Sequence, residues 1–274
     1  MSTFPELWSG PCSGRVIAWA SLAQYSLTER PVNYNWNWRI YWEPAPNGTG
    51  TYLDMLLSGL VLTIETAICA WIIALVFGSV VGVLRTLPSK TAFRIGSAWV
   101  EFFRNMPLLV QLFLWFFVLP EILPQSWGLW LKQIPNAPFY TAAIGIGLFM
   151  SARVAEQTRA GINSLPRGQK MAATALGLTT AQTYRYVLLP MAFRIIMPPL
   201  TSEFLNTIKN TSVAITIGLM ELTAEARSMQ EFSFQVFEAF TAATVLYLLI
   251  NIVVVTAMRF LERGLAVPGY ITGK

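Results

Sequence analysis

The amino-acid sequence predicts an all-α integral membrane protein with five transmembrane helices and one short helix at the cytoplasmic surface. Three observations support this prediction. The chain is 54% hydrophobic and only 12% charged, about half the charge of a typical soluble domain. Long apolar segments alternate with short polar ones, and the polar segments alternate between rich and poor in lysine and arginine. The positive-inside rule expects this alternation in a chain that crosses a membrane repeatedly.

Residue types that are missing or rare exclude several functions. No histidine occurs, which removes histidine-dependent catalysis and most zinc and haem sites. The two cysteines are too few for a disulfide framework. The net charge of +5 fits cytoplasmic loops better than nucleic-acid binding in so apolar a chain. No G-x-x-x-x-G-K-[ST] phosphate loop occurs. We therefore predict a protein that is not an enzyme and has no cofactor and no metal site.

Residues 1–50 are predicted to be an extracytoplasmic or interfacial segment. The apolar run at 16–23 is too short to span a bilayer, although it resembles the core of a signal peptide. Alternating Asn and Trp at 33–38 suits a segment that lies on the membrane surface. An alternative hypothesis is that residues 1–31 are an artefact of start-site choice, with the natural chain beginning near Val32.

The membrane domain is predicted over residues 51–263, followed by a cytoplasmic tail at 264–274. Its five spans are predicted at Met55–Leu84, Ser97–Leu119, Gln133–Ala152, Val187–Ile208 and Ala239–Met258. The fourth is weak, because charges and prolines interrupt it, and it is either a helix that faces a polar cavity or no span. Pro120 and Pro124 are expected to end the second span, and Gln125–Asn136 and Glu221–Glu231 are expected to be loops.

The first predicted span contains Gly78 and Gly82 in a G-x-x-x-G pattern. Two glycines at this spacing lie on one helix face and let a second helix approach closely. The pattern is common in apolar helices, so we interpret it as a packing feature.

Cations in the connecting segments orient the predicted bundle. The cation-rich segments hold Arg85, Lys90 and Arg94; Arg159, Arg167, Lys170 and Arg185; and Arg259, Arg263 and Lys274. The intervening segments hold only Lys132, and Lys209 with Arg227 against three glutamates. The positive-inside rule then places the N-terminus outside and the C-terminus in the cytoplasm.

Residues 166–190 fall on the cytoplasmic side of this arrangement and predict a helix, a sharp turn and a second helix. The segment 170–176 is rich in good helix formers, and Gly177 stands where a left-handed C-terminal cap is expected. Thr179 and Gln182 have the spacing of a capping box for the next helix. A DNA-binding helix-turn-helix and a plain connector are the alternatives to a docking element.

This stretch resembles the cytoplasmic signature of permease subunits of ATP-binding-cassette (ABC) importers. That signature reads Glu-Ala-Ala, three residues, Gly, nine residues, Ile, one residue, Leu-Pro; here Met171 replaces Glu and Val187 replaces Ile. The resemblance implies that the helix at 166–177 couples the chain to an ATPase subunit. The coupling residues that it implies are Arg167, Ala172, Ala173, Gly177, Leu178 and Pro190.

Four further stretches resemble the polar amino-acid branch of this family: 101–111, 152–157, 161–169 and 201–217. From about Asn33 onward, the chain resembles the inner-membrane permeases of glutamate/aspartate importers. The resemblance implies the type I importer fold and a location in the bacterial inner membrane. It also implies three kinds of partner: a pair of ATP-binding subunits, a second permease, expected to be a paralogue, and an extracytoplasmic substrate-binding protein.

Charged and amide side chains at membrane depth are the candidates for the substrate path, because an ionisable group there is costly unless it faces a cavity or a partner. These residues are Arg104, Arg153, Glu156, Glu203, Asn206, Lys209 and Asn210. An amino acid carries an ammonium and a carboxylate, so both signs of charge are expected along its path. The alternative is that Glu101–Arg104 and Arg153–Glu156 are structural ion pairs that fix helix register.

Three other functions remain as alternatives: a permease for another polar amino acid such as glutamine, a self-sufficient secondary transporter, and a membrane-embedded enzyme. Many secondary transporters contain inverted repeats, and we find no convincing internal repeat in this sequence. No nucleophile-plus-base cluster supports an enzyme.

Overall fold

The computed structural model of the chain describes residues 34–46, 48 and 50–265. The hypotheses about residues 1–31 and Val32, and most of the predicted tail, lie outside these residues. The chain divides into two compact units, Met1–Trp36 and Asn37–Lys274, and every helix named below belongs to the second.

Three helices of the described residues are long and apolar enough to cross a membrane. They are α2 (Tyr52–Leu84), α7 (Ala137–Asn163) and α12 (Val236–Leu265), and they confirm the first, third and fifth predicted spans. A capping box opens α2, because the side chains of Thr51 and Asp54 each accept a hydrogen bond from the other residue's backbone N–H.

The second predicted span is not one straight helix. It is split into α3 (Lys90–Asn105) and the stretch Leu108–Ile122, which begins with α4 (Leu108–Phe113), and the two directions differ by 100° across the break. Proline disfavours the α-helical conformation in the residue before it, and Met106 before Pro107 is accordingly extended (φ −101°, ψ 128°). Counted as one broken span, this pair raises the number of candidate spans in the described part of the chain to four.

Two short π-helical segments, η2 (Leu114–Val118) and η3 (Tyr184–Leu188), each end two residues before a proline. A proline inside a helix lacks the N–H donor and its ring clashes with the carbonyl four residues earlier. The wider π turn accommodates that clash without ending the helix. Pro120 therefore lies inside α5 (Leu119–Ile122), contrary to the expectation that it ends the span, and Pro190 lies in the first turn of the next helix.

Two segments that we predicted to be loops are helical. They are α6 (Gln125–Gln133) and α11 (Leu222–Ser233). Pro124 stands at the N-cap of α6, and the Glu221 carboxylate accepts a hydrogen bond from Ala224 N at the start of α11. Their short length and mixed polarity concealed both helices in the sequence. Between α10 and α11 lies the 3₁₀ helix η4 (Thr211–Ile217).

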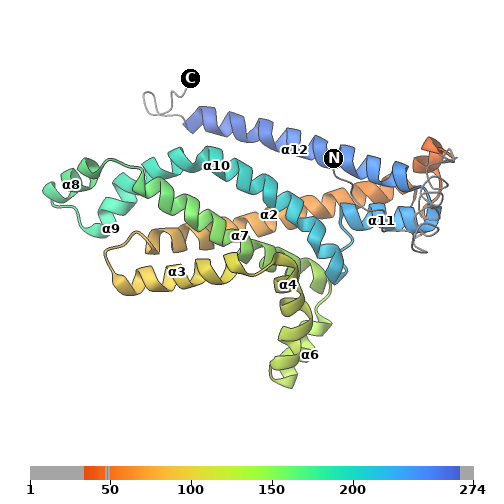
Figure 1. Cartoon of the computed structure of the whole chain (residues 1–274), viewed down its shortest axis with the longest axis horizontal. Coiled ribbons are helices and arrows are strands. Elements are labelled where there is room, and N and C mark those ends of the chain that lie inside the picture. Colours follow the sequence, from red (N-terminus) through yellow and green to blue (C-terminus); the bar gives the residue numbers. More distant parts are fainter. Residues whose placement is uncertain (1–33, 47, 49, 266–274) are drawn as a thin grey trace, which may run out of the picture. The chain divides into compact units, whose positions relative to one another are not determined.

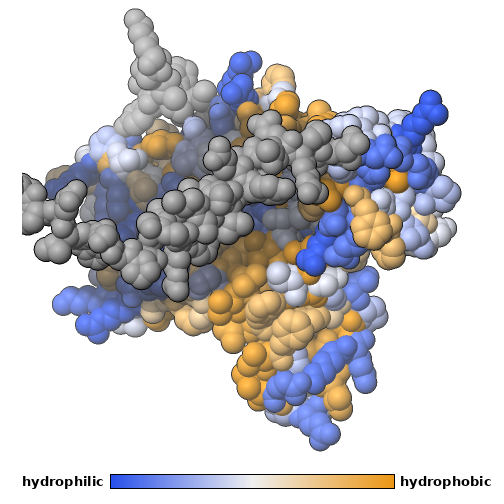
Figure 2. Space-filling view, turned by 45° about the vertical axis from the view of Figure 1, so that its right-hand side comes forward, coloured by the Kyte–Doolittle hydropathy of each residue, from blue (hydrophilic) through white to orange (hydrophobic). Residues whose placement is uncertain are grey.

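The segment from α4 to α6 projects away from the long helices (Figure 1). Large apolar side chains are exposed on it, including Ile122 (72%), Trp127 (67%) and Trp130 (65%). Figure 2 shows hydrophobic residues gathered over this projecting part, with hydrophilic residues at its tip. Such a surface suits an environment of lipid or of another membrane subunit.

Helices α2 and α7 pack closely together, and their interface uses the two glycines of the G-x-x-x-G pattern. A Cβ at Gly78 would stand 2.5 Å from Val154 Cβ, and one at Gly82 would stand 2.5 Å from Thr158 Cβ. Real side chains do not approach this closely, so only glycine permits this helix separation. The predicted packing role is confirmed.

The weak fourth segment is a helix, α10 (Leu189–Asn210), with Pro198 and Pro199 inside it. It does not count among the candidate spans of the described residues. It packs against both α7 and α12 (Figure 1), and a Cβ at Gly161 of α7 would stand 2.3 Å from Ile196 Cγ2. Of its charged residues, Glu203 lines the cavity described below, which agrees with the first of the two outcomes that the sequence left open.

At the other end of α2, helix α11 packs so closely that a Cβ at Gly59 would stand 2.8 Å from Glu225 Cγ. Glu225 is 8% exposed, and burial, followed by the nearby charge of Glu221, raises its pKa to about 7. Its usual pKa is 4.5, so between about pH 4.5 and 7 the folded state binds more protons than the unfolded state. The free energy of unfolding therefore falls as pH rises through this window.

We expect the unfolding temperature of the detergent-purified protein to fall by several degrees between pH 5 and pH 8, at about 2–4 °C per kcal/mol for a chain of this size. Glu225→Gln should flatten this pH dependence, whereas Glu231→Gln, which removes an exposed partner of Arg227 on the same helix, should leave it unchanged. Differential scanning fluorimetry across the pH range measures both. Equal slopes for Glu225→Gln and the wild type would contradict the assignment.

Candidate functional site

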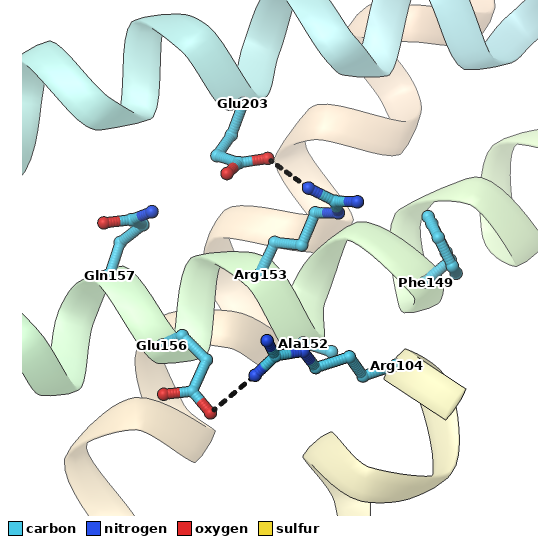
Figure 3. Close-up of a pocket in the computed structure, with 7 residues that line it drawn as sticks. All are labelled: Arg104, Phe149, Ala152, Arg153, Glu156, Gln157 and Glu203. Carbon is cyan, nitrogen blue, oxygen red and sulfur yellow. Dashed lines mark ion pairs between the residues drawn. The ribbon is translucent and has the colours of Figure 1, made fainter. Parts of the chain in front are cut away.

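A charged cavity of about 290 Å³ lies between α3, α7 and α10. Its lining residues come from all three helices: Arg104, Phe149, Ala152, Arg153, Glu156, Gln157 and Glu203 (Figure 3). Four of the seven predicted substrate-path residues, the two arginines and the two glutamates, are therefore brought together. The volume is roughly ten times the ~30 Å³ share of one liquid water, so a free amino acid fits.

The ion pairs in this cavity join different helices. Arg153 Nη1 of α7 lies 3.7 Å from Glu203 Oε2 of α10, and Arg104 Nη1 of α3 lies 3.7 Å from Glu156 Oε1 of α7 (Figure 3). Among the residues described, no ion pair joins Glu101 to Arg104 or Arg153 to Glu156. The alternative of same-helix register pairs is wrong, because side chains three apart are also free to turn toward a neighbouring helix.

Glu203 carries the least satisfied charge of the cavity. The residue is 8% exposed, and its Oε2 atom has no hydrogen-bond partner. The 3.7 Å separation from Arg153 is too long for a hydrogen bond. A buried carboxylate oxygen in this state gains free energy from any donor that reaches it. It is well placed to receive an ammonium group.

The arginines supply the complementary chemistry. Half of the Arg153 side chain is exposed, and that of Arg104 is 66% exposed. A guanidinium offers several donors in a plane and binds carboxylates through two parallel hydrogen bonds. The cavity thus presents acceptors for an ammonium and donors for carboxylates to the same small ligand.

The other three predicted substrate-path residues, Asn206, Lys209 and Asn210, do not line this cavity. They lie further along α10. Lys209 is exposed, and Asn210 Nδ2 donates to Met150 Sδ at 3.3 Å. Their assignment to the path stays a prediction.

Arg85 belongs to the same charge network, and the sequence did not single it out beyond its place among the loop cations. It caps the C-terminal end of α2, and its side chain is 8% exposed. Its Nη1 atom donates to Glu156 Oε1 at 2.9 Å. The helices from α3 to α6 separate Arg85 from Glu156 along the chain, so no local pattern reveals this pairing.

The predicted cytoplasmic element is a helix, α8 (Arg167–Ala175), with a C-terminal turn in the left-handed conformation at Gly177 (φ 77°). Leu178 N donates to Ala173 O at 3.1 Å and Gly177 N donates to Thr174 O at 3.0 Å, which is the Schellman arrangement. Both the helix and its glycine cap are confirmed, with Pro166 at the N-cap of the helix.

The second helix of this element, α9 (Thr180–Thr183), opens with the predicted capping box. Gln182 N donates to Thr179 Oγ1, and Thr179 N donates to Gln182 Oε1. Tyr184 then donates its hydroxyl to Thr86 O at 2.7 Å, beyond the end of α2. Capping and this long-range hydrogen bond make the element a rigid extension of the bundle.

The predicted coupling residues divide between an inner and an outer face. Ala173 is buried at 3% exposure and Leu178 is half-buried, whereas Arg167, Ala172, Gly177 and Pro190 are exposed. Next to them, Met171 and Leu176 are 70% and 80% exposed. Apolar side chains this exposed on a short helix indicate an interaction surface.

A model of one protein family matches residues 49–267, and it is described as binding-protein-dependent transport system inner membrane component. The chain is 48% identical over 246 residues to the glutamate/aspartate import permease protein GltJ of Escherichia coli, covering 89% of this chain and all of GltJ. It is 36% identical to PatM of Vibrio harveyi, a probable amino-acid ABC transporter permease, over 71% of this chain and 84% of PatM.

Two solved structures share the architecture. The crystal structure of an amino acid ABC transporter with histidines matches with a TM-score of 0.66 at 30% identity, over 77% of this chain and 94% of that chain. The inward-facing methionine ABC transporter MetNI matches with a TM-score of 0.67 at 19% identity, over 78% of this chain and 98% of that chain. A match at this identity supports the fold alone. On these matches, the chain has the type I ABC permease fold and belongs to the family of binding-protein-dependent transport system inner membrane components, as a non-catalytic permease subunit of an amino-acid importer.

Proposed function

We propose that this chain is one permease of an ATP-driven importer of glutamate and aspartate, and that the α3–α7–α10 cavity is its part of the substrate path. The observation that carries the proposal is the cavity itself, in which the unsatisfied buried carboxylate of Glu203 faces Arg153, and a second partly exposed arginine, Arg104, belongs to the same lining. The likeness to GltJ, whose name describes a glutamate/aspartate import permease, supports this substrate class.

The charges suit a dicarboxylic amino acid bound in one orientation. Glu203 is the acceptor for the α-ammonium, because its Oε2 atom lacks a donor. Arg153 lies beside it and is the natural partner of the α-carboxylate, and Arg104 is the partner of the side-chain carboxylate. Opposite charge acts most strongly at Glu203, whose carboxylate is buried.

The chain is oriented with its N-terminus outside and its C-terminus in the cytoplasm, and forms five membrane crossings that include the broken α3–α4 pair and α10. The α2–α3 turn, the α8–α9 element and the C-terminal end of α12 lie at one end of the bundle (Figure 1). The cation-rich segments of the sequence are these same three regions, and the positive-inside rule supports a cytoplasmic position for them.

Energy comes from a pair of separate ATP-binding subunits, with α8 docked on one of them. The exposed Met171, Ala172 and Leu176 form the outer contact, and the buried Ala173 together with the Tyr184–Thr86 hydrogen bond carries movement into the bundle. A second permease, proposed to be a paralogue, forms the other half of the path. An extracytoplasmic binding protein delivers the substrate.

Arg153→Gln is expected to lower glutamate uptake at least tenfold, because a charge-assisted contact of about 1.5–3 kcal/mol is lost. ATP hydrolysis and the yield of assembled complex should stay near the wild-type level. Uptake of radiolabelled glutamate into proteoliposomes that contain the complete importer measures the effect. Arg194→Gln, which changes an exposed arginine of α10, is the matched control. Loss of assembly in Arg153→Gln would favour a purely structural role for this arginine.

A permease for glutamine is the second candidate, because the chain is also 30% identical to the glutamine transport system permease protein GlnP of Escherichia coli over 84% of its length. The two arginines in the cavity favour the acidic substrate. Competition of unlabelled glutamine, glutamate and aspartate against labelled glutamate in the same vesicles separates the two. Stronger competition by glutamine would select the second candidate.

A further inference from the structure

The cavity's own lining is electrically neutral, since Arg104 and Arg153 balance Glu156 and Glu203. A neutral lining does not by itself explain a preference for a substrate with an extra negative charge. The charge that breaks the balance is that of Arg85, which is not a lining residue and lies behind the cavity at the end of α2.

Arg85 and Arg104 compete for the same oxygen atom. Arg85 Nη1 lies 2.9 Å from Glu156 Oε1, within hydrogen-bond distance, whereas Arg104 Nη1 lies 3.7 Å from it. The Arg85 side chain is 8% exposed and that of Arg104 is 66% exposed. The Arg85–Glu156 pair is shorter and better shielded from water than the Arg104–Glu156 pair. Glu156 is therefore neutralised by Arg85, which does not line the cavity.

The position of Arg85 is built into the packing of α3 against α2. A Cβ at Gly96 would stand 2.6 Å from Arg85 Cγ and 3.2 Å from Val81 O. The absence of a side chain at Gly96 leaves the channel through which the methylene stem of Arg85 runs toward α7. The arginine is thereby held in one direction, toward Glu156.

We propose that Arg85 is a positioning residue that sets the charge selectivity of the substrate path, by binding Glu156 and so leaving Arg104 available to an anionic side chain. This inference rests on the proposed function of the cavity. Without Arg85, Glu156 turns fully to Arg104, no positive charge remains in excess around the cavity, and the preference for a dicarboxylic over an uncharged amino acid is lost.

The test is equilibrium binding of labelled glutamate and labelled glutamine to the complete importer in nanodiscs, without ATP and without binding protein, so that only the membrane path selects. Arg85→Gln should weaken glutamate binding about tenfold, the effect of one charged hydrogen bond, and leave glutamine binding within about twofold. Adding Glu156→Gln should restore glutamate binding, because the freed arginine loses its competitor. Arg94→Gln, at an exposed arginine of α3, should change neither.

A parallel fall in binding of both ligands, or no rescue by Glu156→Gln, would overturn the proposal, because control of charge selectivity requires a loss that is confined to glutamate and that is reversed when the carboxylate competing for Arg104 is removed. If Arg85→Gln does not assemble, Arg85→Met, which keeps an unbranched stem but removes the charge, makes the same comparison with and without Glu156→Gln. Arg153→Gln distinguishes failure of the proposed function from failure of the role of Arg85. If glutamate binding is unchanged in Arg153→Gln, the cavity is not the substrate path. If glutamate binding is weakened in Arg153→Gln but Arg85→Gln keeps the preference for glutamate over glutamine, only the role of Arg85 is refuted.

Discussion

Replacing Gly78 and Gly82 together by valine is expected to lower the amount of folded importer in the membrane severalfold. Each valine would bring its Cβ within about 2.5 Å of a side-chain carbon of α7, and also within 2.7–2.8 Å of the backbone oxygens of Ser151 and Ala155. Backbone atoms cannot turn aside, so α2 and α7 must separate. An overpacked position costs about 1–3 kcal/mol, against a total stability of about 5–15 kcal/mol.

Quantitative immunoblotting of membranes, followed by size-exclusion chromatography of the solubilised complex, measures this loss. Gly264→Val is the control, because a Cβ there meets nothing within 4 Å. Wild-type amounts of complex in the double variant would show that the α2–α7 separation is not set by these glycines.

Gly177→Val is expected to uncouple ATP hydrolysis from transport while leaving the bundle intact. Gly177 has φ 77°, and a Cβ there meets nothing within 4 Å, so the cost comes from the backbone alone. The left-handed conformation costs an ordinary residue about 1–2 kcal/mol, and a β-branched one more. The end of α8 must then change direction. Substrate uptake should fall at least tenfold, with the permease still present in the membrane at its normal amount.

Gly177→Asn is the matched control, since asparagine tolerates the left-handed region and serves as a helix C-cap. Uptake in the asparagine variant should stay within about threefold of the wild type, because the added strain is small. Stimulation of ATP hydrolysis by the binding protein is the second measurement. Normal uptake in Gly177→Val would count heavily against docking through α8.

Local patterns in the sequence were sufficient for the long apolar helices and for the caps of the cytoplasmic element. The spans that correspond to α2, α7 and α12 can be predicted from length and hydropathy alone. The Gly177 cap and the Thr179–Gln182 capping box can be predicted from residues a few positions apart. The bend after α3 was also visible in principle, because Pro107 restricts the residue before it. We predicted a continuous span through this proline, since hydropathy stays high on both sides of it.

Side-chain pairing in the cavity was not predictable in this way. Four of the seven residues selected by their depth in apolar segments line the cavity, but the pairs cross between helices, as Arg153–Glu203 and Arg104–Glu156 show. Which residues meet depends on the helix separation set by Gly78 and Gly82 and on the direction of Arg85. Helices α6 and α11 were missed for a related reason, because packing against neighbours rather than an apolar period stabilises such short segments.

ATP-dependent uptake by proteoliposomes that contain this chain, its permease partner and the ATP-binding subunits, with the binding protein outside, tests the central claim most directly. We predict accumulation of labelled glutamate only when ATP is enclosed and the binding protein is present, with aspartate competing better than glutamine. Accumulation driven by an ion gradient without ATP, or by this chain alone, would contradict the assignment as an importer permease.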